Sequence, residues 1–594
     1  MKKLLYAFLL PGLIATSGCN SLKQMTNLAD EQDLQVSPNP LEVHADTVTF
    51  DMSVNLPVKM LKKENVYTVN TFYKYGQQEV TLEPIEFRAT DYPNASTEQP
   101  RQSKSFSFAY TDAMSQPGSL EVQGVATNPA KPDKVEETPR MPVAPGIITT
   151  SKLAQPAFYA VYADHGYNNQ EELVPTRIDF FFDQGRSALK SSEKRSERGK
   201  EFEGFIADKN VTKTVSITGT HSPEGTETIN SNLSEDRAAV IEKYYRAQMK
   251  RYDYKGMADS INFILKPVIQ DWNDFKNALA EYEGITSEEK SEYLNIINGG
   301  GAFIDTEKQL KSLPTYKKVF NEVYPGLRSA KTEILTVKEK KTDAEISVLA
   351  KQITQNQASA DTLSEQELMY AATLTPSLEE KAAIYEAATK KSGSWNAHNN
   401  LGAVYIAMAI ENPSTASSNG SKAKAQLDIA ANKNASAGQV HANLASVYLL
   451  QGNYVKANSE LNQASGLSSD DNQGVNGVKG AVQIMLADYA GAVRSESSAS
   501  ETAVNSFNKG LAQLLNKDYQ NAINSFNEAT SQDENFALAY YAAAVAQARA
   551  NNLQGVVDSL KTAVGKDPEL KSKALNDLEF RNYVANELFT AALR

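Results

Sequence analysis

The sequence predicts a multidomain protein with an N-terminal antiparallel β-sandwich, a central α/β domain with a helical insertion, and a C-terminal α-solenoid. Hydrophobic residues alternate with period two from Pro40 to about Ala126, which is typical of short strands. A strand–helix–strand–helix order follows Pro175, and a helical pattern repeats roughly every 34 residues after Leu363. The 594 residues exceed what a single core usually holds.

Composition excludes several classes of function. The chain is 41% hydrophobic and 22% charged with a net charge of −12, so we expect no nucleic-acid partner. Its five histidines are scattered and it has one cysteine, so no metal or cofactor is expected. Nucleophile-elbow, zinc-protease and nucleotide-loop motifs do not occur in the sequence, and we therefore predict a protein that is not an enzyme.

The first residues, "MKKLLYAFLLPGLIATSGCN", combine two lysines, a short apolar stretch and small residues before the cysteine. This pattern resembles a bacterial lipoprotein signal, although Thr16 stands where leucine is usual. The resemblance implies that residues 1–18 are a signal peptide and that Cys19 carries acyl chains in a membrane. The alternative is an ordinary secretory signal with a free thiol. We expect residues 19–36 to form a polar tether.

Residues 37–165 are predicted to form the β-sandwich together with a linker. In "LEVHADTVTFDMSV" the apolar residues fall on alternate positions, and four further segments of this kind follow. The stretch Thr127–Gly146 is rich in proline and charge and is predicted to be a linker or long loop. We expect this domain to act as a spacer or packing platform.

Residues 170–345 are predicted to form the α/β domain. "RIDFFFD" and "KTVSITG" are strands that alternate with helices, and "KTEILTV" is the last strand. The polar stretch of about residues 252–325 is predicted to be a helical insertion before that strand.

A turn and the helix after it contain the most specific motif, "GTHSPEGTETINSNLSEDRA". It resembles the OmpA-like domain that binds the peptide stem of peptidoglycan. The matching positions are Gly219, Gly225, Asn230, Leu233, Ser234, Arg237 and Ala238. The "SPEG" turn resembles a variant found in OmpA-like proteins of Bacteroidota.

The resemblance implies a site for diaminopimelate, a zwitterion. Arg237 would pair with its carboxylate, and the family uses an aspartate for its ammonium. Ser222 stands in place of that aspartate, and Glu224 is the candidate that supplies the missing carboxylate. Asn230 is assigned to the same peptidoglycan-binding site. The alternative is that Arg237 only braces the turn.

Residues 363–594 carry a recurring small–large–small trio. Clear copies are Ala423/Leu427/Ala430, Ala457/Leu461/Ala464, Ala522/Phe526/Ala529 and Val556/Leu560/Ala563, with a weaker copy from Ala492. The preceding helices carry "HNNLGAVY" and "HANLASVY". These spacings resemble tetratricopeptide repeats, which implies a groove that binds a protein partner. A plain helical bundle is the alternative.

These expectations combine into an outer-membrane lipoprotein scaffold that docks on peptidoglycan and recruits a protein partner through its repeats. "NSLKQ" after Cys19 lacks an acidic cluster, which favours the periplasmic side. The alternative is a subunit of an envelope or secretion/assembly complex whose OmpA-like domain does not bind peptidoglycan.

Overall fold

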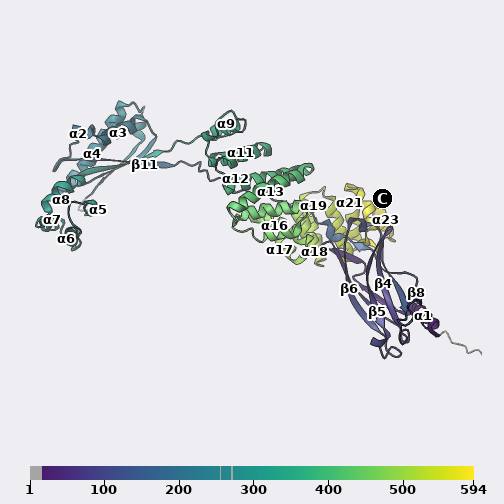
Figure 1. Cartoon of the computed structure of the whole chain (residues 1–594). Helices are drawn as coiled ribbons and strands as arrows, with labels where there is room; N and C mark the ends of the chain where they lie inside the picture. The colour runs from purple at the N-terminus through teal and green to yellow at the C-terminus, as the bar shows by residue number, and fades with distance from the viewer. Residues whose placement is uncertain (1–16, 255, 269–271) are drawn as a thin grey trace, which may run out of the picture. The chain divides into compact units, whose positions relative to one another are not determined.

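The computed structural model describes residues 17–254, 256–268 and 272–594 (Figure 1). Residues 1–16 of the predicted signal peptide therefore lie outside the described residues. The chain divides into two compact units, each of which is described by itself. One unit contains the residues up to Tyr167 and those from Asp343 onward, and the other is Asn168–Thr342.

The N-terminal β-rich region is present as two five-stranded sheets that share one hydrophobic core. One sheet contains β1 (Asp33–Ser37), β2 (Leu41–His44), β3 (Thr47–Asn55), β6 (Arg101–Ala109) and β10 (Ile147–Ile148). The other contains β4 (Val66–Tyr75), β5 (Gln78–Arg88), β7 (Gly118–Thr127), β8 (Val135–Glu137) and β9 (Met141–Pro145). All neighbours are antiparallel except β2 and β10. Phe50 and Phe106 face each other across β3 and β6 with their ring centroids 5.1 Å apart.

The predicted polar tether over residues 19–36 is wrong. Residues Ser17–Asn27 form α1, whose Leu22 and Met25 are buried in the core of the sandwich. The spacing of three residues places both side chains on one helix face. Burial of this apolar face stabilises a helix in a segment that is otherwise polar. The linker prediction for Thr127–Gly146 is wrong in part, because β8 and β9 pair with β7 at the edge of the sheet, where proline is tolerated.

The unit Asn168–Thr342 is an α/β domain with the strand order β11-β14-β12-β13. Its strands are β11 (Leu173–Phe181), β12 (Thr212–Gly219), β13 (Asn262–Pro267) and β14 (Ser329–Val337). Its helices before β13 are α2 (Ser191–Lys194), α3 (Glu197–Ala207) and α4 (Glu227–Arg251). Phe180, Phe202 and Tyr245 meet in its core, with Phe202 and Tyr245 edge to face at 5.1 Å.

The stretch predicted as a helical insertion, about residues 252–325, is not helical throughout. It contains β13, which pairs in parallel with β12 and extends the sheet. The helices that follow are α5 (Asn273–Glu281), α6 (Ser287–Asn298), α7 (Phe303–Leu310) and α8 (Tyr316–Glu322). They surround a core of their own in which Phe275, Tyr293 and Tyr324 are buried. Apolar and polar residues do not alternate clearly in β13, because most of its side chains are exposed, and the sequence pattern therefore did not indicate a strand.

The C-terminal region is a stack of antiparallel helix pairs, which Figure 1 shows one after another along the chain. The pairs are α12 (Trp395–Glu411) with α13 (Ala416–Lys433), α14 (Gly438–Leu450) with α15 (Tyr454–Leu461), α16 (Ser469–Met485) with α17 (Tyr489–Glu496), α18 (Ala503–Leu515) with α19 (Tyr519–Gln532), and α20 (Ala537–Arg549) with α21 (Leu553–Lys566). Leu427 and Phe526 of the predicted trios are fully buried. Added Cβ atoms on Gly402 and Gly510 would lie 2.7 and 2.8 Å from these side chains, so the small residues let the paired helices approach.

The helical region begins earlier than residue 363. Helix α9 (Asp343–Thr354) shares a core with α10 (Glu365–Ala371) and α11 (Leu378–Lys391). At the other end, α22 (Glu569–Asn576) and α23 (Glu587–Ala592) cover the last pair, with Phe580 and Phe589 buried. Among the described residues, no helix combines the length and the apolar character needed to cross a bilayer.

Candidate functional site

The predicted turn lies between the end of β12 and the start of α4. Gly219 is required there because an added Cβ would lie 1.9 Å from the carbonyl oxygen of Ser234. Gly225 adopts φ +122°, a conformation that residues with a side chain rarely adopt. Thr226 caps the helix by accepting a hydrogen bond from the Ile229 amide at 3.4 Å. The two glycines and the cap therefore fix the path of the turn.

Arg237 is buried beneath this turn and binds backbone. Its Nε donates to the Arg186 carbonyl at 3.1 Å, and its two terminal nitrogens donate to the carbonyls of Thr220 at 2.6 Å and Asp183 at 3.3 Å. These bonds use three of the five guanidinium N–H groups. Burial, followed by the nearby charge of Arg328, lowers the pKa of Arg237 to about 10, so it remains charged at neutral pH.

Ser222 and Glu224 share a partner that the sequence did not indicate. Arg328, just before β14, donates from Nε to Ser222 Oγ at 3.0 Å and from a terminal nitrogen to Glu224 Oε1 at 2.8 Å. All three residues are largely buried. The motif covers only the turn and the first part of α4, and Arg328 arrives through the pairing of β14 with β12, which explains why sequence reasoning missed it.

The four predicted binding residues, Arg237, Ser222, Glu224 and Asn230, line one cavity of about 270 Å³. Two polar atoms buried in its wall, Glu224 Oε2 and the side-chain nitrogen of Asn230, have no hydrogen-bond partner among the described residues. Buried polar groups without partners are uncommon in proteins, so these two atoms are available to bind a ligand or water. The cavity thus offers one charged acceptor and at least one donor. The described residues include no cluster of His, Cys, Asp and Glu suited to a metal.

The second candidate site is the groove of the repeats, and a segment of the same chain occupies it. We call residues 154–167 the strap. They follow the sandwich and form neither helix nor strand. Asn443 accepts from the Val161 amide at 2.8 Å and donates to the Val161 carbonyl at 2.7 Å. Asn400 makes the same pair of bonds to Ala163, at 2.6 and 2.9 Å.

A third asparagine repeats this arrangement further along the groove. Asn508 on α18 accepts from the Gln155 amide at 3.0 Å and donates to the Gln155 carbonyl at 2.9 Å. Between them, Ser446 donates to the Tyr159 carbonyl at 2.9 Å. The strap therefore runs from α18 back toward α12, opposite to the order of the repeats. Asn400 and Asn443 stand before the leucine of "HNNLGAVY" and "HANLASVY", and this shared position is the signal that could have identified them.

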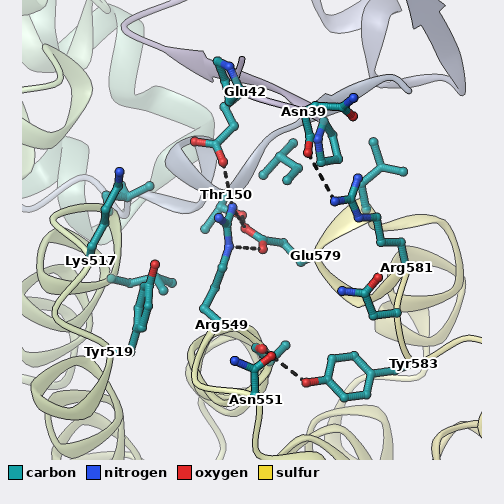
Figure 2. A pocket seen from close by; sticks show the side chains of 18 of the residues that line it. Asn39, Glu42, Thr150, Lys517, Tyr519, Arg549, Asn551, Glu579, Arg581 and Tyr583 are labelled. Carbon is teal, nitrogen blue, oxygen red and sulfur yellow. Dashed lines mark hydrogen bonds and ion pairs between the residues drawn. The ribbon is translucent and has the colours of Figure 1, made fainter. Parts of the chain in front are cut away.

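A third candidate site is a cavity where the sandwich meets the last repeat, in the same unit. It measures about 440 Å³, and Figure 2 shows its wall of charged and aromatic side chains. Arg549 of α20 binds Glu42 of β2 at 2.9 Å and Glu579 at 2.5 and 3.0 Å. Glu579 also accepts from Thr150 at 2.6 Å. The hydrogen bond from His44 and the charge of Arg549 lower the pKa of Glu42 to about 2, against the effect of burial.

No protein-family model matches the chain, and no curated protein matches it. Solved structures with related helical repeats include YrrB, "a TPR protein with an unusual peptide-binding site", at 23% identity over 29% of this chain and 91% of that one, with a TM-score of 0.25. PilF of Pseudomonas aeruginosa is 14% identical over 41% and 98% of the two chains, with a TM-score of 0.29. Part of a repeat protein from Cytophaga hutchinsonii is 15% identical over 39% and 91%, with a TM-score of 0.28. All three TM-scores are below 0.5. The resemblance of the C-terminal helical region to tetratricopeptide repeat proteins rests on the helix pairs and the small–large–small trios described above.

Proposed function

We propose that this protein is a non-enzymatic scaffold of the bacterial envelope. Its α/β domain docks on peptidoglycan by binding the zwitterionic end of diaminopimelate, its repeat region recruits a protein partner, and acyl chains on Cys19 hold it at the outer membrane, facing the periplasm. The observation that carries the docking proposal is the cavity in which Arg237, Ser222, Glu224 and Asn230 meet.

Two sets of polar groups in the cavity support a zwitterionic ligand. Glu224 is held by Arg328 through Oε1, which leaves Oε2 as an acceptor for an ammonium group. Arg237 keeps two unused N–H groups, and the Asn230 amide adds a donor for a carboxylate. The N-terminus of the long helix α4 lies at the same turn and favours the anionic end.

The experiment is co-sedimentation of the full chain with purified peptidoglycan sacculi. Wild type should pellet with sacculi, and free diaminopimelate should release it. Glu224→Gln keeps the size of the side chain and removes the charge, so it should weaken binding by about tenfold, as expected for loss of one charged contact. Arg195→Ala removes an exposed arginine of the same domain and is the matched control, expected to bind as wild type does.

The second candidate is an assembly subunit whose α/β domain does not bind peptidoglycan. It is favoured by the three backbone carbonyls that Arg237 already binds, because a bracing role needs nothing else. Under this alternative, Arg237→Ala lowers the melting temperature and wild type stays in the supernatant. Equal pelleting of wild type and a natively folded Glu224→Gln protein would contradict the assignment of Glu224 to the site.

A further inference from the structure

Side chains of the repeat groove bind the backbone of the strap. Asn400, Asn443 and Asn508 each bind both the amide and the carbonyl of one strap residue. A paired bond of this kind requires an extended peptide and does not depend on the side chain at that residue. The geometry therefore suits any extended segment in the same register, and the strap is one example of it.

The side chains of the strap limit which peptide sequences fit the groove. Val161 and Ala163 are buried in the groove, whereas Tyr162 and Asp164 between and beyond them are exposed, as the alternation of an extended chain requires. Gly474 makes room for the ring of Tyr159, since an added Cβ would lie 2.4 Å from it. The groove thus accepts an aromatic residue, then a β-branched residue two positions later, then a small residue two positions after that.

We infer that the strap is an autoinhibitory ligand of the groove, and that the partner is an extended segment with the pattern aromatic-x-Val-x-Ala. This inference adds detail to the proposed recruitment of a partner. It depends on that proposal only in assuming that a partner exists. The strap is continuous with the sandwich, which the Arg549–Glu42 ion pair holds against the last repeat. Attachment within one chain gives the strap an effective concentration in about the millimolar range, which a free peptide at micromolar concentration cannot match.

The release of the strap is therefore the step that opens the groove. It is tested with the full chain and a fluorescein-labelled peptide of residues 154–167. Val161→Asp with Ala163→Asp places two carboxylates at the buried strap positions and leaves every groove residue unchanged. Pro156→Asp adds a carboxylate at an exposed strap position and is the matched control. Chymotrypsin cleavage at Phe158, Tyr159 or Tyr162 reports whether the strap has left the groove.

Wild type and Pro156→Asp should resist cleavage in the strap and bind the peptide only weakly. The double variant should be cleaved there and should bind the peptide at least about tenfold more tightly, measured by fluorescence anisotropy. Adding Asn443→Ala to the double variant should remove most of this gain, because the two hydrogen bonds to the backbone of Val161 in the peptide are lost. Where the double variant lacks native circular dichroism, Tyr159→Gly with Val161→Gly removes the anchors without adding charge.

Two results would overturn the inference: equal affinity of wild type and the opened variant, or an opened variant with native helicity that does not bind the peptide. A variant that binds the peptide but captures no envelope protein supports the autoinhibitory role of the strap and contradicts the recruitment role. The two failures are therefore distinguishable, and neither depends on binding to sacculi.

Discussion

Glu42 of the sandwich and Arg549 of the last repeat pair form an ion pair of 2.9 Å across more than five hundred residues of sequence (Figure 2). The same guanidinium binds Glu579, whose side chain is only 2% exposed. The strap continues from this junction into the groove, where Asn508 binds Gln155. The sandwich, the strap and the repeats are thus joined by specific polar contacts in addition to apolar packing.

Arg549→Met should destabilise this unit, because it leaves the buried Glu579 carboxylate without its cation. Removal of one partner of a buried ion pair lowers the free energy of unfolding by about 3–5 kcal/mol. The Arg549 side chain is 33% exposed, so we expect a loss at the lower end of this range. Urea denaturation of the full chain, followed by circular dichroism, measures the loss. Arg494→Met removes an exposed arginine of the repeats and should leave the transition in place. Similar shifts for both variants would show that the ion pair contributes nothing specific.

Glu496 should make the repeats less stable as the pH rises. It occupies the large position of the weaker trio, where other repeats have Leu427 or Phe526, and it is 4% exposed. Burial raises its pKa well above 4.5, outweighing the opposite effects of Asn508 and Lys509. A raised pKa in the folded state means that the stabilising contribution is complete below pH 4.5 and is lost as the pH rises through the folded-state pKa.

Glu496→Gln should remove that pH dependence, since the amide does not ionise. Melting temperatures of wild type and variant, measured from pH 4.5 upward, should diverge, with the variant melting higher at alkaline pH. Parallel curves over this range would contradict the assignment. Glu528→Gln, at an exposed position of α19, controls for the change in net charge.

Leu461→Ala and Phe526→Ala should each destabilise the repeat region by about 2–5 kcal/mol through the cavities that they leave. Both side chains are buried between paired helices. The test is a denaturation series in which Val455→Ala, a truncation at a position 71% exposed, serves as the control. An effect of Leu461→Ala no larger than that of Val455→Ala would be inconsistent with its place in the core.

Cys19→Ala should move the protein from the detergent phase to the aqueous phase after membrane extraction. The expectation follows from the "SGCN" pattern, and a variant without acyl chains lacks the groups that we propose to insert into the bilayer. The readout is phase partitioning with and without the substitution, with Ser21→Ala as a neighbouring control. Unchanged partitioning of Cys19→Ala would show that something other than an acyl anchor holds the protein.

The local periodicity of hydrophobic residues was sufficient to predict the strands and helices that bury one face. The strand β3 alternates Val48, Phe50, Met52 and Val54 toward the core, as the sequence pattern indicates. The small–large–small trios likewise predict the contact faces of the second helices, because residues three and four apart lie on one side of a helix. The motif around Gly219 and Gly225 predicts a turn. The structure shows why both glycines are needed there: the chain at Gly219 approaches Ser234 closely, and Gly225 has a positive φ. The four candidate site residues come together there.

The sequence by itself therefore determined the β-rich region, the helical repeats and the candidate residues of the turn, since those signals repeat or lie close together along the chain. Only the tertiary structure decided the rest. Arg328 reaches Glu224 because two strands pair across more than a hundred residues. The sequence of the strap shows no alternation of apolar and polar residues, since residues 157–163 are all apolar or aromatic. Its backbone is satisfied by groove residues that lie hundreds of positions away. Contacts of that range leave no local pattern, and this physical reason explains why the occupied groove could be seen only in the folded chain.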